Sequence, residues 1–271
     1  MSKDKIIVQE LYLYPVKSAK GLTLQGSLID KFGLEFDRRW MIIDESGRFV
    51  TQRECPKMAT LQTQIKDSFL RLSMTGVGNI EIPLNNSSGK DVFVTVWNDK
   101  VRAKDCGNEV AYFLKKALSR DYRLVFMELP DRKIEGVDKK IFPFSDSSPF
   151  LILSQESLGD LNKRLERPLS IDRFRPNIVT KGGEPYAEDF WAEYKIANIG
   201  FKKLKDCSRC QVTTVDQSKG IFDGKEPLKT LAQYRLRNNK VCFGQNAYHL
   251  EEGKISVGDS IQILKKLTVP C

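Results

Sequence analysis

The chain consists mainly of short stretches in which apolar and polar residues alternate, separated by turn-forming residues. This alternation is typical of β-strands that bury one face. Residues 39–43 and 49–52 flank the turn-forming residues 44–47, which predicts a β-hairpin. Further strands are expected at residues 5–16, 58–65, 68–74, 79–83, 92–96 and 100–104. So many short strands favour an antiparallel, barrel-like β domain over a β-α-β sheet.

Three segments have their apolar residues at helical spacing. Helices are expected at residues 108–118, 155–166 and 227–236. Ser154 is a suitable N-cap for the second helix, and Pro227 suits the first turn of the third. The predicted fold class is therefore mainly β with a few helices, of the α+β kind.

At 271 residues the chain is long enough for one large domain or two modest ones. Its hydrophobic fraction of 41% is ordinary for a globular protein, which excludes wholesale disorder. Residues 131–140 (DRKIEGVDKK) have little to bury and predict a loop or linker within 127–143. We therefore expect two domains, at residues 4–126 and 127–267.

The net charge of +9 raises the question of nucleic-acid binding, because Lys and Arg clusters neutralise phosphates. The 44 basic residues are, however, spread along the chain among 35 acidic ones, and no zinc-finger, basic-zipper or ribonucleoprotein motif is present. A solvated basic surface is the favoured interpretation, and we expect no nucleic-acid partner.

The longest apolar runs, such as residues 150–153, are far shorter than the roughly 20 residues that a membrane helix needs. The first five residues, Met-Ser-Lys-Asp-Lys, are followed by no apolar core of the kind that secretory signals contain. We therefore expect no membrane association and a cytoplasmic location.

Six cysteines occur, but only Cys207 and Cys210 are closely spaced. In a large chain without an export signal, reduced thiols are expected rather than disulfides. The remaining four are expected to be isolated core or surface thiols: Cys55, Cys106, Cys242 and Cys271.

The Cys207-Ser208-Arg209-Cys210 segment has three ordinary interpretations: half of a zinc site, a dithiol redox couple, or two thiols of which one has a special role. A structural zinc site needs further cysteines or histidines, and His249 is the only histidine. A thioredoxin-like motif opens a helix, whereas the β-branched residues at 212–215 predict a strand. A thiolate beside Arg209 suits a soft transition metal carried by a cofactor, and two buried structural cysteines remain the alternative.

Two basic segments near the start of the chain are candidate anion sites. Lys17 and Ser18 close the first expected strand, where an ammonium, a hydroxyl and backbone N–H groups can bind an anion. Arg38 and Arg39 run into the next strand, and strand alternation allows only one of the two to enter a given site. Taken alone, each segment is equally compatible with a solvated turn or surface charge.

Two further candidates lie in the second half of the chain. Arg175 and Asn177 flank Pro176, which fixes the backbone, and their side chains can bind a phosphate or the edge of a polar heterocycle. Residues 144–149 (FSDSSP) form a polar loop before the apolar run at 150–153. Without other evidence, that loop is a simple turn before a strand.

Taken in order, these segments resemble the MOSC family, the proteins with a molybdenum-cofactor sulfurase C-terminal domain. The resemblance is to members that also carry a MOSC N-terminal β-barrel domain, such as the bacterial YcbX proteins and the mitochondrial amidoxime-reducing components. It spans nearly the whole chain, in the stretches LYLYPVKS (11–18), GLEFDRRWMIID (33–44), FSDSSPFLILSQESLGDLNKRLE (144–166), RFRPNI (173–178), CSRCQVTTVD (207–216), KEPLKTLAQYR (225–235) and FGQN (243–246).

The resemblance implies two β-barrel domains and a pterin-based molybdenum cofactor whose metal is bound by a cysteine thiolate. The family's arginine-cysteine step matches Arg209 and Cys210, so Cys210 is the expected ligand and Cys207 the lesser candidate. Asp146 is expected to act near the metal. The cofactor-binding residues that the resemblance implies are Lys17, Ser18, Arg38, Ser147, Ser148, Arg175, Asn177, Ser208 and Arg209.

The resemblance also implies an activity, the two-electron reduction of N-hydroxylated compounds such as amidoximes and hydroxylamines, with a role in detoxification. Many bacterial relatives carry a C-terminal ferredoxin domain and the mitochondrial ones an N-terminal anchor, and neither is expected here. Electrons are therefore expected from a separate protein, such as a flavin reductase, a ferredoxin or a cytochrome b5-like protein.

Two other functions stay open from the sequence. In the first, Cys210 carries a persulfide and the chain transfers sulfur without molybdenum. In the second, the chain is a basic binding module, for which Cys210→Ala would be tolerated and polyanion binding would depend steeply on salt.

Overall fold

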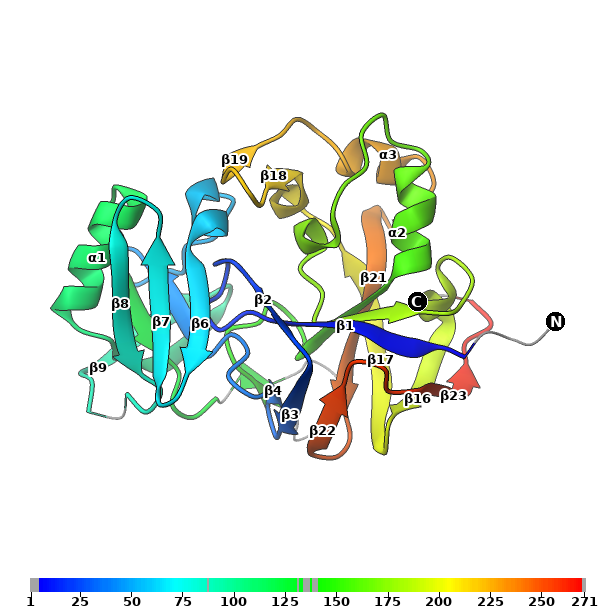
Figure 1. The fold of residues 1–271 in the computed structure, drawn as a ribbon, viewed down its shortest axis with the longest axis horizontal. Coiled ribbons are helices and arrows are strands. Elements are labelled where there is room, and N and C mark those ends of the chain that lie inside the picture. The colour runs from blue at the N-terminus through cyan, green and yellow to red at the C-terminus, as the bar shows by residue number, and fades with distance from the viewer. Residues whose placement is uncertain (1–4, 87, 131, 134–136, 138–140, 270–271) are drawn as a thin grey trace.

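The computed structural model describes residues 5–86, 88–130, 132–133, 137 and 141–269. These residues form two β-rich lobes that lie side by side (Figure 1). One lobe contains α1 and β6 to β9, and the other contains β1, β17, β21 and the helices α2 and α3. The expected mainly β architecture, with few helices, is confirmed.

The larger lobe is built on a nine-stranded sheet in the order β2-β1-β15-β14-β21-β17-β16-β23, with β20 paired to β21. The sheet curls like a barrel. Strands β1 and β23 lie near opposite ends of the strand order, yet Ile7 of β1 forms a bridge to Ser260, directly before β23. Its core includes Phe150, Tyr194 and Phe201. The strand bounds are β1 Ile7–Leu13, β2 Leu22–Leu24, β14 Phe150–Ser154, β15 Ile178–Lys181, β16 Trp191–Ile196, β17 Ile199–Ser208, β20 Leu236–Arg237, β21 Lys240–His249 and β23 Ile261–Lys266.

The smaller lobe packs the sheet β5-β11-β10-β9 and the meander β6-β7-β8 around a separate core. Helix α1 covers this core with Val110, Phe113 and Leu114, which lie on one helical face. The bounds are β5 Trp40–Ile43, β6 Gln62–Lys66, β7 Phe69–Met74, β8 Gly78–Pro83, β9 Asp91–Val96, β10 Asp99–Asp105, α1 Asn108–Leu118 and β11 Arg123–Phe126.

Short elements connect and cover these sheets. Strands β14 and β15 are parallel and joined through α2, so one β-α-β unit sits within an otherwise antiparallel sheet. The remaining bounds are β3 Gly26–Asp30, β4 Gly33–Leu34, η1 Pro56–Thr60, β12 Arg132–Lys133, β13 Ile141–Phe142, α2 Gln155–Asn162, η2 Ile171–Phe174, η3 Ala187–Phe190, η4 Gln211–Thr214, β18 Val215–Asp216, β19 Ile221–Phe222, α3 Leu228–Ala232 and β22 Gly253–Ser256.

The expected helix at 108–118 is confirmed with the same bounds, because its apolar stripe is unambiguous. Ser154 caps α2 as predicted, since its side chain accepts a hydrogen bond from the Ser157 N–H. Helix α2 ends four residues earlier than expected, at Asn162, whose side-chain amide bonds the carbonyl and the N–H of Leu169 and so holds the chain that follows in a turn. Helix α3 is also shorter, with Pro227 as its N-cap.

Three strand predictions were wrong in part. The expected hairpin strand at 49–52 is reduced to an isolated bridge between Phe49 and Ile43. The segment predicted as a strand at 58–65 begins as the 3₁₀ helix η1, which Pro56 opens, and becomes strand β6 only at Gln62. The β-branched run at 212–215 lies mainly in η4 rather than in a strand. Thr213 and Thr214 instead bond their hydroxyls to the carbonyls of Cys210 and Gln211, which competes with strand pairing.

The expected division of the chain near residue 127 stays a prediction. Strands from both sides of that point pair with each other, because β1 pairs with β15 and β3 pairs with β22. Most of the expected linker at 131–140 lies outside the described residues. Arg132, however, is buried, and its guanidinium bonds Asp99 and the carbonyls of Pro143 and Ser145.

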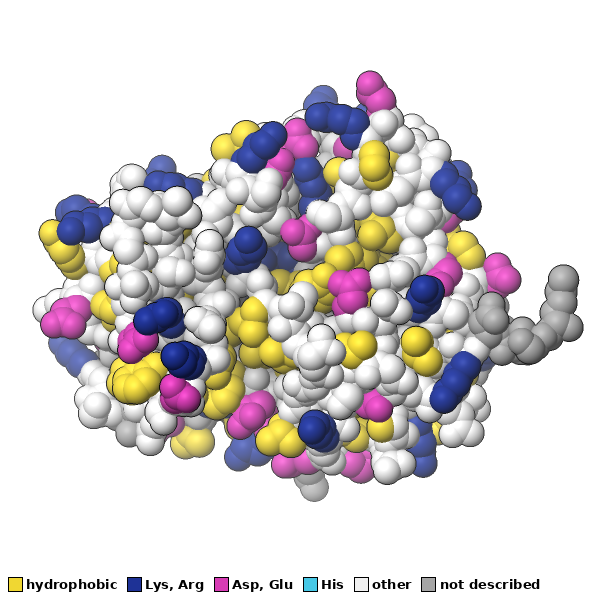
Figure 2. Space-filling view, viewed as in Figure 1, with side chains coloured by type: hydrophobic (Ala, Val, Ile, Leu, Met, Phe, Trp, Pro, Cys, Tyr) yellow, Lys and Arg dark blue, Asp and Glu magenta, His cyan; other side chains and the backbone are white. Residues whose placement is uncertain are grey.

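None of the helices in the described part of the chain is long and apolar enough to cross a membrane. On the face drawn in Figure 2, basic and acidic side chains lie interspersed over both lobes. That distribution agrees with the expectation that the basic residues are solvated and spread among acidic ones rather than clustered.

Candidate functional site

A cavity of about 480 Å³ is lined by residues from both halves of the chain. Its volume lies within the range of small-molecule and cofactor sites, ~300–1,000 Å³. The eleven candidate residues that the sequence singled out all line it: Lys17, Ser18, Arg38, Asp146, Ser147, Ser148, Arg175, Asn177, Ser208, Arg209 and Cys210. The fold thus brings together segments separated by up to 193 positions in the chain (17 to 210).

Turns and strand ends carry these side chains. Lys17 and Ser18 follow β1, where the Lys17 N–H bonds the Trp40 carbonyl, and Arg38 lies two positions before the start of β5. Arg175 ends the 3₁₀ helix η2, and Ser208 ends β17. Loops at the ends of sheet strands can turn side chains into a cavity without breaking the strand ladder.

Four of the lining residues have backbone conformations that side chains rarely adopt. Ser18 has φ 66°, Arg38 φ 48°, Trp97 φ 56° and Arg175 φ 56°. These left-handed conformations are unfavourable for residues other than glycine, and they cluster at functional sites. The surrounding packing therefore holds several cavity residues in positions that the backbone alone disfavours.

The two cysteines of the CxxC segment have different surroundings. The Cys207 sulfur accepts a hydrogen bond of 2.9 Å from Nη1 of Arg209. Burial raises the pKa of the Cys207 thiol, and the charge of Arg209 offsets only part of this effect, so Cys207 is protonated at neutral pH. Arg209, which we expected to favour a thiolate at Cys210, therefore contacts the other cysteine.

Cys210 instead lies beside Arg53, a residue that the sequence analysis missed. Nη2 of Arg53 is 3.3 Å from the Cys210 sulfur, and its guanidinium carbon lies 5.0 Å above the ring of Trp97. Trp97, also missed, lies at the β9–β10 turn and donates from Nε1 to Oδ1 of Asp146 at 3.2 Å. Neither residue belongs to a motif, although a tryptophan in a polar hairpin turn (Trp97-Asn98-Asp99) is an unusual choice.

The local structure around Cys210 also corrects the argument against a dithiol motif. Strand β17 runs into the segment and ends at Ser208, and the helical turn η4 begins directly after Cys210. The turn has only four residues, which is too short to give the dipole of an α-helix. The strand expected after Cys210 was thus wrong, and η4 gives Cys210 no helix dipole.

Asp146 and Lys17 form an ion pair across the cavity, and Nζ of Lys17 also donates to the Phe144 carbonyl at 2.7 Å. Partial desolvation at the cavity wall opposes ionisation of Asp146. The charge of Lys17 and the hydrogen bonds from Lys17 and Trp97 outweigh it and hold the pKa of Asp146 well below its ordinary value. The side chain is still 60% exposed, because the cavity is open to solvent. Asp146 is therefore an ionised hydrogen-bond acceptor at neutral pH.

Arg38 and Arg39 diverge as the sequence predicted. Nη1 of Arg38 contacts Asp37 at 2.5 Å and the amide oxygen of Asn177 at 2.9 Å, on the cavity side. Arg39 instead donates to the carbonyls of Met127 and Glu128. Strand alternation is not what directs Arg38 and Arg39 to different places, because Arg38 precedes the strand and adopts a left-handed turn conformation.

Arg175 and Arg209 have unused capacity to bind an anion. Arg175 donates to the Ala19 carbonyl at 2.7 Å and lies over the ring of Tyr14, but it makes no ion pair with any residue that the structure describes. Burial, followed by the charge of Arg38, lowers the pKa of Arg175 to about 10, so it keeps its charge at neutral pH. In Arg209, the buried Nε has no hydrogen-bond partner among the described residues.

The cavity is strongly basic. Six lining side chains are cationic (Lys17, Arg38, Arg53, Arg175, Lys205 and Arg209), whereas Asp146 is the one carboxylate among the described lining residues, and Lys17 already pairs with it. Fixed positive charges around a concave site attract anions. The arrangement therefore suits an anionic ligand that lies next to a cysteine sulfur.

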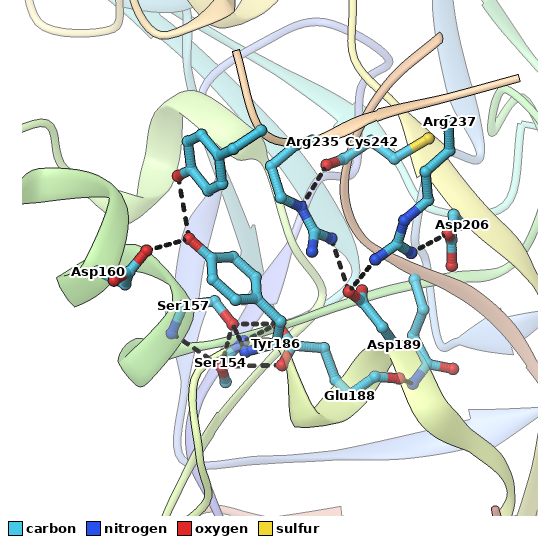
Figure 3. A network of polar contacts seen from close by, with 12 residues as sticks. Ser154, Ser157, Asp160, Tyr186, Glu188, Asp189, Asp206, Arg235, Arg237 and Cys242 are labelled. Carbon is cyan, nitrogen blue, oxygen red and sulfur yellow. Dashed lines mark hydrogen bonds and ion pairs between the residues drawn. The ribbon is translucent and has the colours of Figure 1, made fainter. Parts of the chain in front are cut away.

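A buried polar network lies behind the cysteine-bearing strand (Figure 3). Arg235 and Arg237 both donate to Oδ2 of Asp189, at 2.7 and 2.9 Å, and Arg237 also pairs with Asp206. Asp206 directly precedes Cys207 on β17. The network thus ties the end of β17 to η3 and β20 and fixes the starting point of the CxxC segment.

Comparison with known proteins gives the same assignment over both lobes. The model of the MOSC N-terminal beta barrel domain matches residues 5–121, and the model of the MOSC domain matches residues 139–262. The chain belongs to the MOSC family. Its relatives include mitochondrial amidoxime-reducing component 1 of Mus musculus, 36% identical over 95% of this chain and 82% of the relative, and mitochondrial amidoxime reducing component 2 of Bos taurus, 38% identical over 94% and 82%.

The similarity of this MOSC protein to solved structures is weaker. The YUAD protein of Bacillus subtilis is 12% identical, covers 95% of this chain and 94% of its own, and has a TM-score of 0.42. The family assignment therefore rests on the family models and on the sequence relatives.

Proposed function

We propose that this MOSC protein reduces N-hydroxylated compounds such as amidoximes and hydroxylamines, and that it does so with a molybdenum cofactor bound in the cavity between its lobes. One observation carries the proposal: a cysteine sulfur, arginines that make no ion pair with any described residue, and an ionised aspartate all line the same cavity. Relatives named amidoxime-reducing components, 36–38% identical over almost the whole chain, support the choice of substrate class.

The residues present fit the proposed cofactor. A pterin cofactor of this kind carries a phosphate and a metal bound by sulfur, and the cavity offers guanidinium groups for the first and Cys210 for the second. Arg175 lacks an ion-pair partner among the described residues, and the buried Nε of Arg209 is unbonded within that same set. Both groups can donate a further hydrogen bond to an anion.

In the proposed reaction, the N–O bond of the substrate breaks, the nitrogen takes up a proton, and the oxygen leaves as water with a second proton. Two electrons balance the step, and we propose that a separate redox protein supplies them, such as a flavin reductase, a ferredoxin or a cytochrome b5-like protein. When bound, the cofactor supplies a metal that can accept oxygen and store these electrons. The cytoplasmic location expected from the sequence stays a prediction.

In this proposal, the side chains of the protein bind the cofactor and orient the substrate. Cys210 would hold the metal, while Lys17, Ser18, Arg38, Ser147, Ser148, Arg175, Asn177, Ser208 and Arg209 would hold the pterin and its phosphate. Asn177 can act only in part, because its amide oxygen already accepts from Arg38 and from the Leu151 N–H. Asp146, held by Lys17 and Trp97, would accept a hydrogen bond from the substrate nitrogen.

The activity is tested with protein from a host that makes the molybdenum cofactor, with a chemically reduced viologen as electron source and benzamidoxime as substrate. We expect benzamidine to form with two viologen molecules oxidised for each product, since the reaction consumes two electrons. Metal-loaded protein that oxidises no viologen in the presence of benzamidoxime or a hydroxylamine would contradict the proposal.

Replacing Arg175 by alanine is expected to lower cofactor occupancy, because it removes a charge-assisted contact worth about 1.5–3 kcal/mol. Molybdenum per chain, measured at limiting cofactor, should fall clearly below that of the unmodified protein. Arg39→Ala is the matched control, since Arg39 bonds carbonyls outside the cavity. Equal metal content in the Arg175 variant and the control would refute this role.

A further inference from the structure

Arg53 occupies the cavity beside the proposed metal ligand, yet the proposed reaction gives it no task. Its Nη2 lies 3.3 Å from the Cys210 sulfur, and its guanidinium lies over the ring of Trp97. It forms no ion pair with any residue that the structure describes. The charge of Arg53 thus lies next to the reacting centre without a direct ion-pair partner, and the carboxylates of Asp146 and Glu54 act on it only from beyond contact distance.

The surroundings hold this guanidinium at the open side of the cavity. Trp97 is 44% exposed, and its ring packs on Phe49 with 5.1 Å between centroids. Because Trp97 also bonds Asp146, its ring and the Asp146 carboxylate lie on the same side as Arg53. A small molecule that approaches Cys210 from solvent therefore comes close to the charge of Arg53.

Substrate and product of the proposed reaction differ in charge. An amidoxime is a weak base and is neutral at pH 7, whereas the amidine formed from it is a strong base and is cationic. The cofactor accounts for Lys17, Arg38, Arg175 and Arg209, which leaves Arg53 and Lys205 as cavity cations without an assigned anion. At contact distance in a partly enclosed site, like charges repel enough to change a binding constant by at least about tenfold.

We propose that Arg53 is a specificity-determining residue that admits the neutral N-hydroxylated substrate and repels the cationic amidine product. This inference rests on the proposed function and extends it to product release. Arg53 acts through its fixed charge, and Trp97 and Cys210 hold that charge at the place where the product forms. The enzyme would then resist inhibition by its own product.

The test compares the binding of benzamidinium, a cation, with that of benzamide, its neutral analogue. Trp97 gives a direct signal, since Trp40 and Trp191 are 0% and 2% exposed and a fluorescence change on binding reports Trp97. In Arg53→Gln, benzamidinium should bind at least about tenfold more tightly, while benzamide binding should change by less than about twofold. Arg53→Lys, which keeps the charge, should bind benzamidinium as weakly as the unmodified protein.

Arg48→Gln is the matched control, because Arg48 lies five positions before Arg53 in the same connection between β5 and η1 and is exposed outside the cavity. Trp97→Phe should abolish the fluorescence signal. Unchanged benzamidinium binding in Arg53→Gln, or an equal change for both compounds, would overturn the proposal, and benzamide binding shows that the variant is folded. Because equilibrium binding needs no turnover, a failure here is distinguishable from a failure of the reductase assay.

Discussion

Replacing Cys210 by serine is expected to abolish reduction of N-hydroxylated compounds, with kcat/KM lowered by at least about 10³-fold. A serine hydroxyl is a far weaker ligand for a soft metal than a thiolate, so the variant should also lose metal. Activity with reduced viologen and molybdenum content should be measured on the same preparations. The fold should survive, because Cys210 lies at a partly exposed loop position and not in the core.

Cys207→Ser is the control for this change, and it should be mild. Serine can still accept the hydrogen bond that Nη1 of Arg209 gives to Cys207, and the raised pKa of Cys207 keeps that thiol protonated. We expect activity within about tenfold of the unmodified protein and unchanged metal content. Loss of metal in the Cys207 variant together with retention in the Cys210 variant would reverse the ligand assignment.

Replacing Asp189 by alanine is expected to lower the free energy of unfolding by about 3–5 kcal/mol. Asp189 is fully buried, and its carboxylate is the counter-charge that Arg235 and Arg237 share. Without it, the Cys242 carbonyl is the one acceptor that the described residues still offer to the buried guanidinium of Arg235. Urea denaturation followed by circular dichroism measures the change.

Asp91→Ala gives the comparison, since Asp91 pairs with Arg102 and Lys104 on the surface and its loss should alter stability little. If the Asp189 variant is no less stable than the Asp91 variant, the network of Figure 3 does not hold the larger lobe together. Because Asp206 joins this network to the residue before Cys207, partial loss of metal in the Asp189 variant is a second expected effect.

The sequence predicted elements best where periodicity was unambiguous. The apolar stripe of α1 and the alternation of β7 to β10 leave one buried face each, so local pattern and tertiary structure agree. It failed at 212–215, where threonine hydroxyls bond backbone carbonyls and give the 3₁₀ turn η4. It also failed at 58–61, where Pro56 opens a 3₁₀ helix ahead of β6.

The candidate site was predictable because its residues lie in motifs that resemble one family, and the cavity brings all of them together. The contacts among these residues were not predictable from the sequence. The resemblance placed Arg209 beside Cys210, but the guanidinium bonds Cys207, while Arg53 comes from a distant turn to contact Cys210. Sequence spacing cannot give such contacts, because they depend on how the two lobes pack.

The most direct test of the central claim is the molybdenum content per chain, measured by inductively coupled plasma mass spectrometry on protein from a host that makes the cofactor. The account predicts about one molybdenum per chain in the unmodified protein and almost none in Cys210→Ser. Protein from such a host that contains no molybdenum, with Cys210 found instead as a persulfide by intact mass, would contradict it and favour a sulfur-transfer function.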